Sequence, residues 1–352
     1  MEKNGIFESL PGALLPWYRQ NKRDLPWRAD REPYHVWISE IMLQQTRVEA
    51  VKGYYERFLT ALPTVEALAY AEDEILHKLW EGLGYYSRVR NLKKAAQSIM
   101  NDYGGIFPGE YTKLIKLPGV GEYTAGALCS IAFNQRTPAV DGNVLRVIAR
   151  LTNDSTPVDT PAFKRAAKEA LALVYPEAAG DFTQALMELG ATLCGPNRKP
   201  DCEVCPCRQF CRGYLENTAE HLPVKLPKRG RREETMTVFI LRCRERYALE
   251  KRPDQGLLAG LWQFPNIPGF LDAQQALDKV EEMGLHPVGI TGQVERQHVF
   301  THIQWHMRGV YVEVKEIDES HIWLTEQQIS DQAALPTAFR QFWDIGEDIN
   351  GK

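Results

Sequence analysis

The sequence predicts two domains of different fold class, an all-α domain followed by a smaller α+β domain. Its 352 residues exceed what one hydrophobic core usually holds. Apolar residues recur with helical period up to about residue 215, and β-rich runs appear only after residue 235. We expect an all-α domain over 1–224 with a cysteine-rich loop at 194–211, a basic linker at 225–234, and an α+β domain over 235–352.

The helical signal is clearest from Val36 to Leu59, where apolar residues follow a period close to 3.6 and no alternation with period two is present. Turns that contain glycine or proline separate this stretch from others of the same kind. The further predicted helices are 66–80, 87–102, 122–133, 143–151, 161–174 and 181–193. In the second domain, the predicted strands are Thr235–Cys243, Arg246–Arg252, Val299–Ile303 and Val310–Val314.

Composition is that of an ordinary globular protein, with no apolar run of 18 residues that would predict a membrane span. The N-terminal residues lack the layout of a signal peptide, so we expect a cytoplasmic protein. The net charge of −4 does not favour a polycationic DNA binder, but local basic patches matter more than the total. The segment 225–232 has five basic residues in eight and is either a plain exposed linker or also a contact to DNA phosphates.

Four cysteines within eighteen residues suggest a metal centre. Cys194, Cys202, Cys205 and Cys211 are separated by seven, two and five residues, just after a predicted helix. A tetrahedral zinc site and a [4Fe–4S] cluster both use four thiolates. Zinc sites usually contain two Cys-x-x-Cys pairs and this loop has one, which favours the cluster; unrelated buried cysteines are the remaining alternative. Cys207 is a fifth candidate within the loop.

A glycine-rich turn, Leu117-Pro-Gly-Val-Gly121, lies between two predicted helices. Two glycines around a valine permit a tight turn and bring backbone N–H groups to the start of a helix, where they can bind a DNA phosphate. Together with the segment VDGN at 140–143 and the cysteine loop, this turn resembles the helix-hairpin-helix DNA glycosylases of the endonuclease III type over residues 8–215. The resemblance implies that Leu117, Gly119, Val120 and Gly121 grip the DNA backbone and that the cysteines bind [4Fe–4S].

Tyr123 stands where the bifunctional members of that superfamily carry a lysine that forms a Schiff base with the sugar. A tyrosine cannot form an imine, so we expect removal of a base by water and no strand cleavage.

Four further stretches resemble the MutY-type adenine DNA glycosylases: RDLPWR at 23–28, SEIMLQQTR at 39–47, GLGYYSR at 82–88 and QALMELG at 184–190. The resemblance implies that Glu40 is the catalytic acid, that Asp141 acts on the sugar, and that Tyr123 and Asn143 position Asp141 and the water. It further implies that Gln45, Thr46 and Tyr85 contact the opened duplex. The residues that would line the adenine pocket are Arg23, Leu25, Trp27, Arg28 and Gln184.

These residue types suit base removal. Adenine leaves readily only when protonated, and its N7 becomes accessible once the base has left the stack. A Glu40 held among apolar neighbours can keep a proton near neutral pH, and the carboxylate of Asp141 can stabilise an oxocarbenium-like sugar. Taken singly, Glu40 could be a solvated acid on a helix flank and Asp141 no more than an N-cap.

The C-terminal domain resembles a Nudix domain that lacks the Nudix box, so nucleotide pyrophosphatase activity is not expected. Adenine glycosylases use such a domain to recognise 8-oxoguanine on the opposite strand. The corresponding residues are Phe300, Thr301 and His302, with threonine where the family commonly has serine. The cysteine loop also differs from the family pattern, because the family usually has six residues between its first two cysteines and this chain has seven.

We therefore expect a monomeric base-excision repair enzyme, associated with the nucleoid, that acts on double-stranded DNA containing adenine opposite 8-oxoguanine or guanine. One alternative is a pyrimidine-removing glycosylase and lyase of the same superfamily. Others are an iron–sulfur DNA-binding sensor without catalysis and a zinc-stabilised DNA-binding module.

Overall fold

The computed structural model describes residues 3–227 and 230–343, and the chain divides into two compact units. One comprises Met1–Ala71 and Arg90–Pro227, and the other Glu72–Val89 and Lys228–Lys352. Residues 72–89 thus group with the C-terminal unit, although they lie within the domain expected over 1–224. Residues 228–229 of the expected linker and residues 344–352 of the expected C-terminal domain lie outside the described residues.

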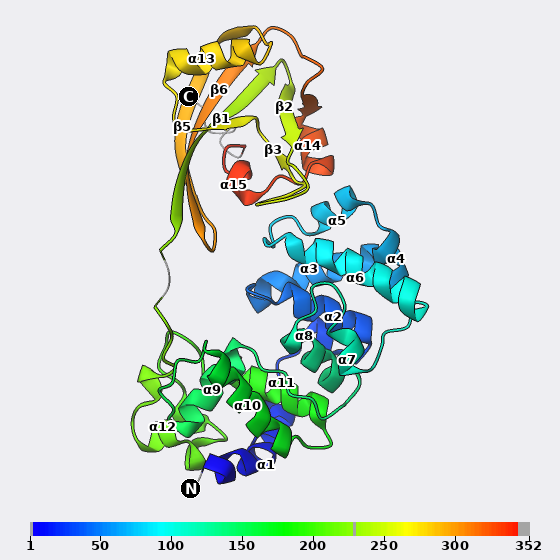
Figure 1. Cartoon of the computed structure of the whole chain (residues 1–352), viewed down its shortest axis with the longest axis vertical. Helices are drawn as coiled ribbons and strands as arrows, with labels where there is room; N and C mark the ends of the chain where they lie inside the picture. The colour runs from blue at the N-terminus through cyan, green and yellow to red at the C-terminus, as the bar shows by residue number, and fades with distance from the viewer. Residues whose placement is uncertain (1–2, 228–229, 344–352) are drawn as a thin grey trace. The chain divides into compact units, whose positions relative to one another are not determined.

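The first unit is helical, as the periodicity predicts (Figure 1). Its longest helix, α1 (Lys3–Asn21), contains two prolines and was not among the predicted stretches. The other helices are α2 (Pro33–Met42), α3 (Val48–Ala61), α4 (Val65–Tyr70), α6 (Ser87–Tyr103, which begins in the second unit), α7 (Tyr111–Leu114), α8 (Glu122–Ala127, continued by a π-helical turn Leu128–Ala132), α9 (Gly142–Thr152), α10 (Pro161–Val174), α11 (Ala179–Thr192) and α12 (Arg212–Leu215).

Two of the predicted helices are interrupted in the structure. The stretch 36–59 is broken after α2 by a turn at 43–47, and the stretch 66–80 is broken between α4 and α5 (Asp73–Leu79). In the first break Gln45 adopts φ 57°, which an α-helix cannot contain. The stretch predicted over 36–59 placed Glu40 and Gln45 on one helix, and this is wrong because the helical backbone ends after α2.

The core that supports the site lies among α1, α9, α10 and α11. Leu14, Val147, Leu171, Phe182 and Leu186 are buried side chains of this core. The apolar residues of α9 and α11 recur on one face, so the two helices pack closely and their polar positions fall at the edge of the core. None of the helices among the described residues is long and apolar enough to cross a membrane.

The second unit is built on a mixed sheet of order β3-β2-β1-β6-β5, with β4 paired to β1 and β7 to β2 (Figure 1). Strands β1 and β6 run parallel from the pair Arg232–Ile303 onward, and β5 and β6 form an antiparallel hairpin. Apolar side chains cover both sheet faces, from α13 on one and α15 on the other. The elements are β1 (Arg232–Cys243), β2 (Arg246–Lys251), β3 (Trp262–Gln263), β4 (Asn266–Pro268), α13 (Ala273–Glu282), β5 (Pro287–Val299), β6 (Ile303–Val314), β7 (Ile322–Thr325), α14 (Glu326–Gln332) and α15 (Thr337–Arg340).

The strand predicted over Val299–Ile303 is wrong, because residues 300–302 form the turn of the β5–β6 hairpin, between Val299 at the end of β5 and Ile303 at the start of β6. The Phe300 N–H donates to the Ile303 carbonyl at 2.8 Å and closes the turn. A β-branched residue at each end gave the segment its strand-like composition, whereas the polar pair between them forms the turn.

Candidate active site and metal centre

Glu40 lies near the end of α2 with 6% of its surface exposed. The Tyr123 hydroxyl on α8 donates a hydrogen bond of 2.5 Å to Glu40 Oε2. Burial raises the pKa of Glu40 to about 7; the hydrogen bond from Tyr123 opposes the rise and the negative charge of Asp141 adds to it. The structure thus encloses the carboxyl and favours its protonated form.

Asp141 is the N-cap of α9, and its two oxygens have different partners. Oδ1 accepts the backbone N–H of Val144 at 2.7 Å, and Oδ2 accepts the side-chain amide of Asn143 at 2.8 Å. Burial raises the pKa of Asp141, and these hydrogen bonds work against the rise. The aspartate is therefore a helix cap whose carboxylate is also held in one orientation.

Asn143 is fixed in turn by the buried Arg146. Nη2 of Arg146 donates to Asn143 Oδ1 at 2.9 Å and to the Gly190 carbonyl at 2.8 Å. Its Nε donates to the carbonyl of Cys194 at 2.9 Å. The amide that holds Asp141 is thus connected through one guanidinium to the start of the cysteine loop.

Glu188 on α11 is a site residue that sequence reasoning missed, although it lies within the quoted stretch 184–190. Its side chain is fully buried and accepts hydrogen bonds from Arg23 Nε at 2.7 Å and from Arg28 Nη2 at 2.7 Å. Burial disfavours its charge, but the two guanidinium groups outweigh burial and lower the pKa of Glu188. Its signal in the sequence is a glutamate spaced four residues after Gln184 on the same helical face, within the otherwise apolar run 185–190.

Of the other residues expected at the adenine pocket, Leu25 and Trp27 lie between Arg23 and Arg28 in the chain, and Gln184 lies on α11 with Glu188. Leu25 and Trp27 are buried, with the Trp27 ring edge-on to Tyr55 at 5.6 Å between centroids. The Arg28 guanidinium lies over the Tyr18 ring at 5.5 Å. Gln184 is partly buried one helical turn before Glu188. The structure therefore places this set in the same unit as Glu40 and Asp141.

The turn between α7 and α8 has the predicted hairpin character. Gly119 adopts φ 75°, and a Cβ at this position would lie 2.6 Å from the Cβ of Asn91, so no other residue fits without displacement. Leu117 and Val120 are buried, and Gly121 is the N-cap of α8. The buried side chains of Leu117 and Val120 thus fix the position of the glycine-containing backbone at the start of α8.

Two of the residues expected to enter the duplex have left-handed backbones. Gln45 is exposed with φ 57°, next to Thr46, and Tyr85 in the second unit is 47% exposed with φ 50°. Such conformations cost non-glycine residues about 1–3 kcal/mol and cluster at functional sites. The Tyr85 hydroxyl lies 3.2 Å from Thr301 Oγ1, within the same unit.

The residues expected to recognise 8-oxoguanine occupy the β5–β6 turn. Phe300 is half-buried with its ring edge-on to Trp305 at 4.8 Å, whereas Thr301 and His302 are exposed. The turn therefore holds the Phe300 ring against Trp305 and leaves the side chains of Thr301 and His302 exposed.

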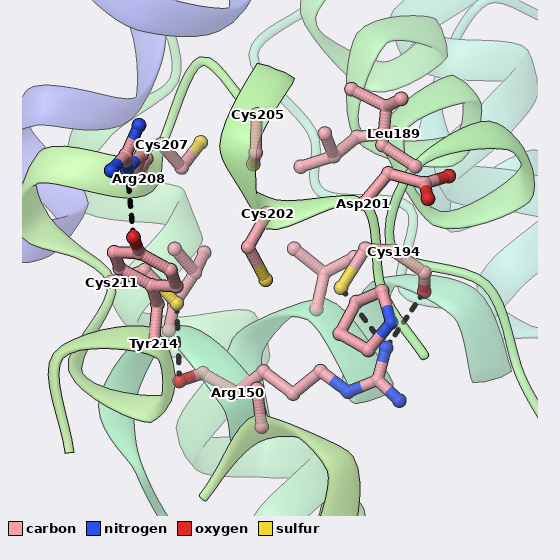
Figure 2. A pocket seen from close by; sticks show the side chains of 15 residues that line it. Arg150, Leu189, Cys194, Asp201, Cys202, Cys205, Cys207, Arg208, Cys211 and Tyr214 are labelled. Atoms are coloured by element: carbon pink, nitrogen blue, oxygen red, sulfur yellow. Dashed lines mark hydrogen bonds between the residues drawn. The ribbon is translucent and has the colours of Figure 1, made fainter. Parts of the chain in front are cut away.

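The cysteine loop closes into one pocket (Figure 2). Cys194, Cys202, Cys205, Cys207 and Cys211 line it together with apolar residues of α9 and α11. The buried Arg150 donates through Nη1 to Cys194 Sγ at 3.2 Å. Within 3–227 and 230–343, no three or more His, Cys, Asp or Glu side chains are placed to hold a single metal ion.

Comparisons with known proteins agree with this architecture. The family model described as HhH-GPD superfamily base excision DNA repair protein matches residues 38–172, and a NUDIX domain model matches residues 237–344. A solved structure of a thermostable thymine-DNA glycosylase is 31% identical with a TM-score of 0.53, and covers 61% of this chain and 98% of that one. That structure therefore leaves about two fifths of this chain uncovered.

Two curated relatives extend over both units. Adenine DNA glycosylase of Mus musculus is 36% identical over 95% of this chain and 77% of its own length. Adenine DNA glycosylase of Arabidopsis thaliana is 39% identical over 86% of this chain, which spans only 56% of that protein's length. From the helical unit with its hairpin, the Nudix-like unit, and the identity to relatives that contain both, we conclude that the chain belongs to the adenine DNA glycosylase family of base-excision repair enzymes.

Proposed function

We propose that this enzyme hydrolyses the N-glycosidic bond of adenine that is mispaired with 8-oxoguanine or guanine in duplex DNA. The observation that carries the proposal is the enclosed Glu40, whose pKa of about 7 lets it hold a proton at the pH at which it must donate one. The adenine is read after it has been flipped into a pocket formed by Arg23, Leu25, Trp27, Arg28 and Gln184, with Glu188 added to that set.

Glu40 is the general acid. Because the Tyr123 hydroxyl occupies Oε2, the proton is carried on Oε1, from which it passes to N7 of the flipped base. Protonation makes adenine a neutral leaving group. The paired arginines Arg23 and Arg28 are held by the single carboxylate of Glu188, so they act as fixed donors to the base edge. One positive charge of the group stays uncompensated, and the charge of Arg28 lowers the pKa of Glu40 against the larger effect of burial.

Asp141 stabilises the sugar as the bond breaks. Both of its oxygens accept hydrogen bonds, which keep the carboxylate in place while positive charge develops at the anomeric carbon. Water then adds to that carbon, and the proton that it loses balances the one that Glu40 gave to the base. Asn143 holds Asp141 for this role, and the glycosylase reaction ends with an abasic site.

This arrangement provides no nucleophile for cleavage of the DNA strand. The position of the lyase lysine holds Tyr123, and burial together with the charge of Glu40 keeps the pKa of its hydroxyl well above the ordinary value, so it is neither an amine nor an available phenolate. This argues against the pyrimidine-removing lyase alternative. The relatives that include the second unit are adenine glycosylases, which argues in the same direction.

DNA is held by the hairpin and read on both strands. The backbone N–H groups around Gly119, Val120 and Gly121 suit a phosphate, with Leu117 anchoring the turn. Gln45, Thr46 and Tyr85 fill or hold open the stack. Phe300, Thr301 and His302 contact the opposite base; Thr301 retains the hydroxyl of the common serine. We place the enzyme with the nucleoid in the cytoplasm, as a monomer.

The cysteine pocket fits a [4Fe–4S] cluster bound by Cys194, Cys202, Cys205 and Cys211. Zinc sites usually contain two Cys-x-x-Cys pairs, whereas this loop contains the single pair Cys202 and Cys205, which favours the cluster over zinc. The guanidinium of Arg150 beside Cys194 compensates the charge of thiolate ligands. When bound, the cluster would supply four iron–thiolate bonds that tie the loop together.

The test is incubation of the full-length enzyme with duplexes that hold adenine opposite 8-oxoguanine, guanine or thymine. Alkali then cleaves at abasic sites, and a parallel sample omits alkali. We expect adenine release opposite 8-oxoguanine and guanine, little opposite thymine, and strand breaks only after alkali. Equal release opposite thymine, or breaks without alkali, would refute the proposal.

A further inference from the structure

The turn that presents Tyr85 contains three residues with positive φ. Gly82 adopts φ 95°, Gly84 adopts φ 70°, and Tyr85 itself adopts φ 50°. The two glycines take up such a backbone freely, whereas for a tyrosine it is unfavourable and needs support from its surroundings. The turn joins α5 to α6. The contacts that stabilise this turn therefore also determine the position of the exposed Tyr85 ring.

Arg88, in the first turn of α6, donates to the carbonyl groups of three successive residues of this turn. Its Nη2 donates to the Leu83 carbonyl at 3.1 Å and to the Gly84 carbonyl at 3.0 Å. Its backbone N–H donates to the Tyr85 carbonyl at 2.9 Å. Because the N–H groups of a guanidinium are fixed in one plane, its side chain can serve two neighbouring carbonyls at once. Arg88 thus holds three consecutive peptide groups in their positions.

The guanidinium of Arg88 also lies close to two aromatic rings. Its Cζ is 5.2 Å from the centre of the Trp80 ring and 5.6 Å from the centre of the Tyr85 ring. A cation over the face of an aromatic ring is attracted to it. Trp80 is fully buried at the end of α5, and its Nε1 donates to the Gly84 carbonyl at 3.1 Å. Arg88 thus connects the exposed ring of Tyr85 to a buried ring and to the turn.

Burial argues against the usual role of an arginine beside DNA. Only 8% of the surface of Arg88 is exposed, compared with 47% for Tyr85. A phosphate contact requires an exposed guanidinium, whereas this one is enclosed by the turn and the rings that it contacts. We propose that Arg88 is a positioning residue, which holds Tyr85 in the conformation that enters the duplex and does not itself contact DNA. This rests on the proposed role of Tyr85.

The experiment measures the single-turnover rate of adenine release by the full-length enzyme from a duplex with adenine opposite 8-oxoguanine. Arg88→Met removes the guanidinium, and Arg88→Lys keeps a charge without the planar fork. Both changes are made in the native chain and in Tyr85→Ala. Arg246→Met, at an exposed position of β2 in the same unit, is the control. Urea denaturation shows that each variant is folded, and Arg88→Lys provides the comparison if Arg88→Met does not fold.

We expect Arg88→Met and Arg88→Lys to release adenine about tenfold more slowly than native, because fewer molecules hold Tyr85 in the required conformation. In the Tyr85→Ala background the same two changes should have no further effect on the rate, since Arg88 then has no ring to position. Arg246→Met should release adenine at the native rate.

Equal fold losses with and without Tyr85 would overturn the proposal, because they would show that Arg88 only stabilises the fold. A native rate in Arg88→Lys would overturn it as well, since lysine can replace arginine at a phosphate but cannot serve as a planar fork. A native rate in Tyr85→Ala would instead overturn the proposed role of Tyr85, and this one with it. Absence of release by the native enzyme would overturn the proposed function itself.

Discussion

Replacing Glu40 with glutamine should stabilise the fold at alkaline pH while it abolishes catalysis. The side chain is enclosed and its pKa is raised from 4.5 to about 7. In the unfolded chain the carboxyl ionises near its ordinary pKa, so between pH 4.5 and 7 the unfolded state releases a proton that the folded state still holds. The folded protein is therefore most stable, with respect to this group, below pH 4.5, and the contribution is lost as pH rises through 7.

The size of the effect follows from the pKa difference. Each tenfold change in proton affinity corresponds to about 1.4 kcal/mol, so ionised Glu40 costs about 3 kcal/mol at pH 9 and under about 1 kcal/mol at pH 5. Glutamine is neutral throughout and keeps an oxygen for the Tyr123 hydroxyl.

Urea denaturation of native and Glu40→Gln proteins at pH 5 and pH 9 measures this difference. We expect the variant to gain about 2–3 kcal/mol relative to native between the two pH values. Glu169→Gln, on the exposed face of α10, is the control and should show no such gain. A stability difference between Glu40→Gln and native that does not change with pH would refute the account of Glu40 as an acid held protonated by burial.

Three further outcomes follow from the contacts of the site. Tyr123→Phe removes a hydrogen bond to ionised Glu40 worth about 1.5–3 kcal/mol, which raises the pKa of Glu40. The loss of single-turnover activity at alkaline pH should therefore occur about one to two pH units higher. An unchanged pH profile would contradict the role of this contact. Gly119→Ala combines a left-handed backbone with a clash and should weaken duplex binding in fluorescence anisotropy, whereas Gly121→Ala, with open space around it, should bind within a few-fold of native; equal effects would contradict the assigned turn. Glu188→Ala leaves two guanidinium groups without their shared carboxylate and should lower the free energy of unfolding in urea by about 3–5 kcal/mol; a loss below about 1 kcal/mol would show that the arginines find other partners.

Features coded by short segments could be predicted from the sequence. The hairpin turn needs glycine at a left-handed position, and Gly119 marks that position in the sequence as it does in the structure. The cysteine loop is likewise local, since its cysteines lie within eighteen residues. The N-cap is local too, since Asp141 bonds to the backbone of Val144 three residues later.

Features that depend on distant partners could not be predicted in the same way. Glu188 is paired with Arg23 across 165 residues, and no local pattern indicates that pair. The break after α2 was missed because the apolar period continues across it, although Gln45 leaves the helical backbone there. The elevated pKa of Glu40 could be expected from its apolar neighbours, whereas the hydrogen bond from Tyr123 required the packing of α2 against α8.

The most direct test of the two-carboxylate mechanism is the single-turnover rate of adenine release by Glu40→Gln and Asp141→Asn, measured with duplex binding of the same proteins. Loss of a general acid typically costs about 10²–10⁴-fold in rate. We predict losses of at least this size for both variants on a duplex with adenine opposite 8-oxoguanine, with duplex affinity within a few-fold of native. Near-native release by either variant would contradict the role assigned to that carboxyl group.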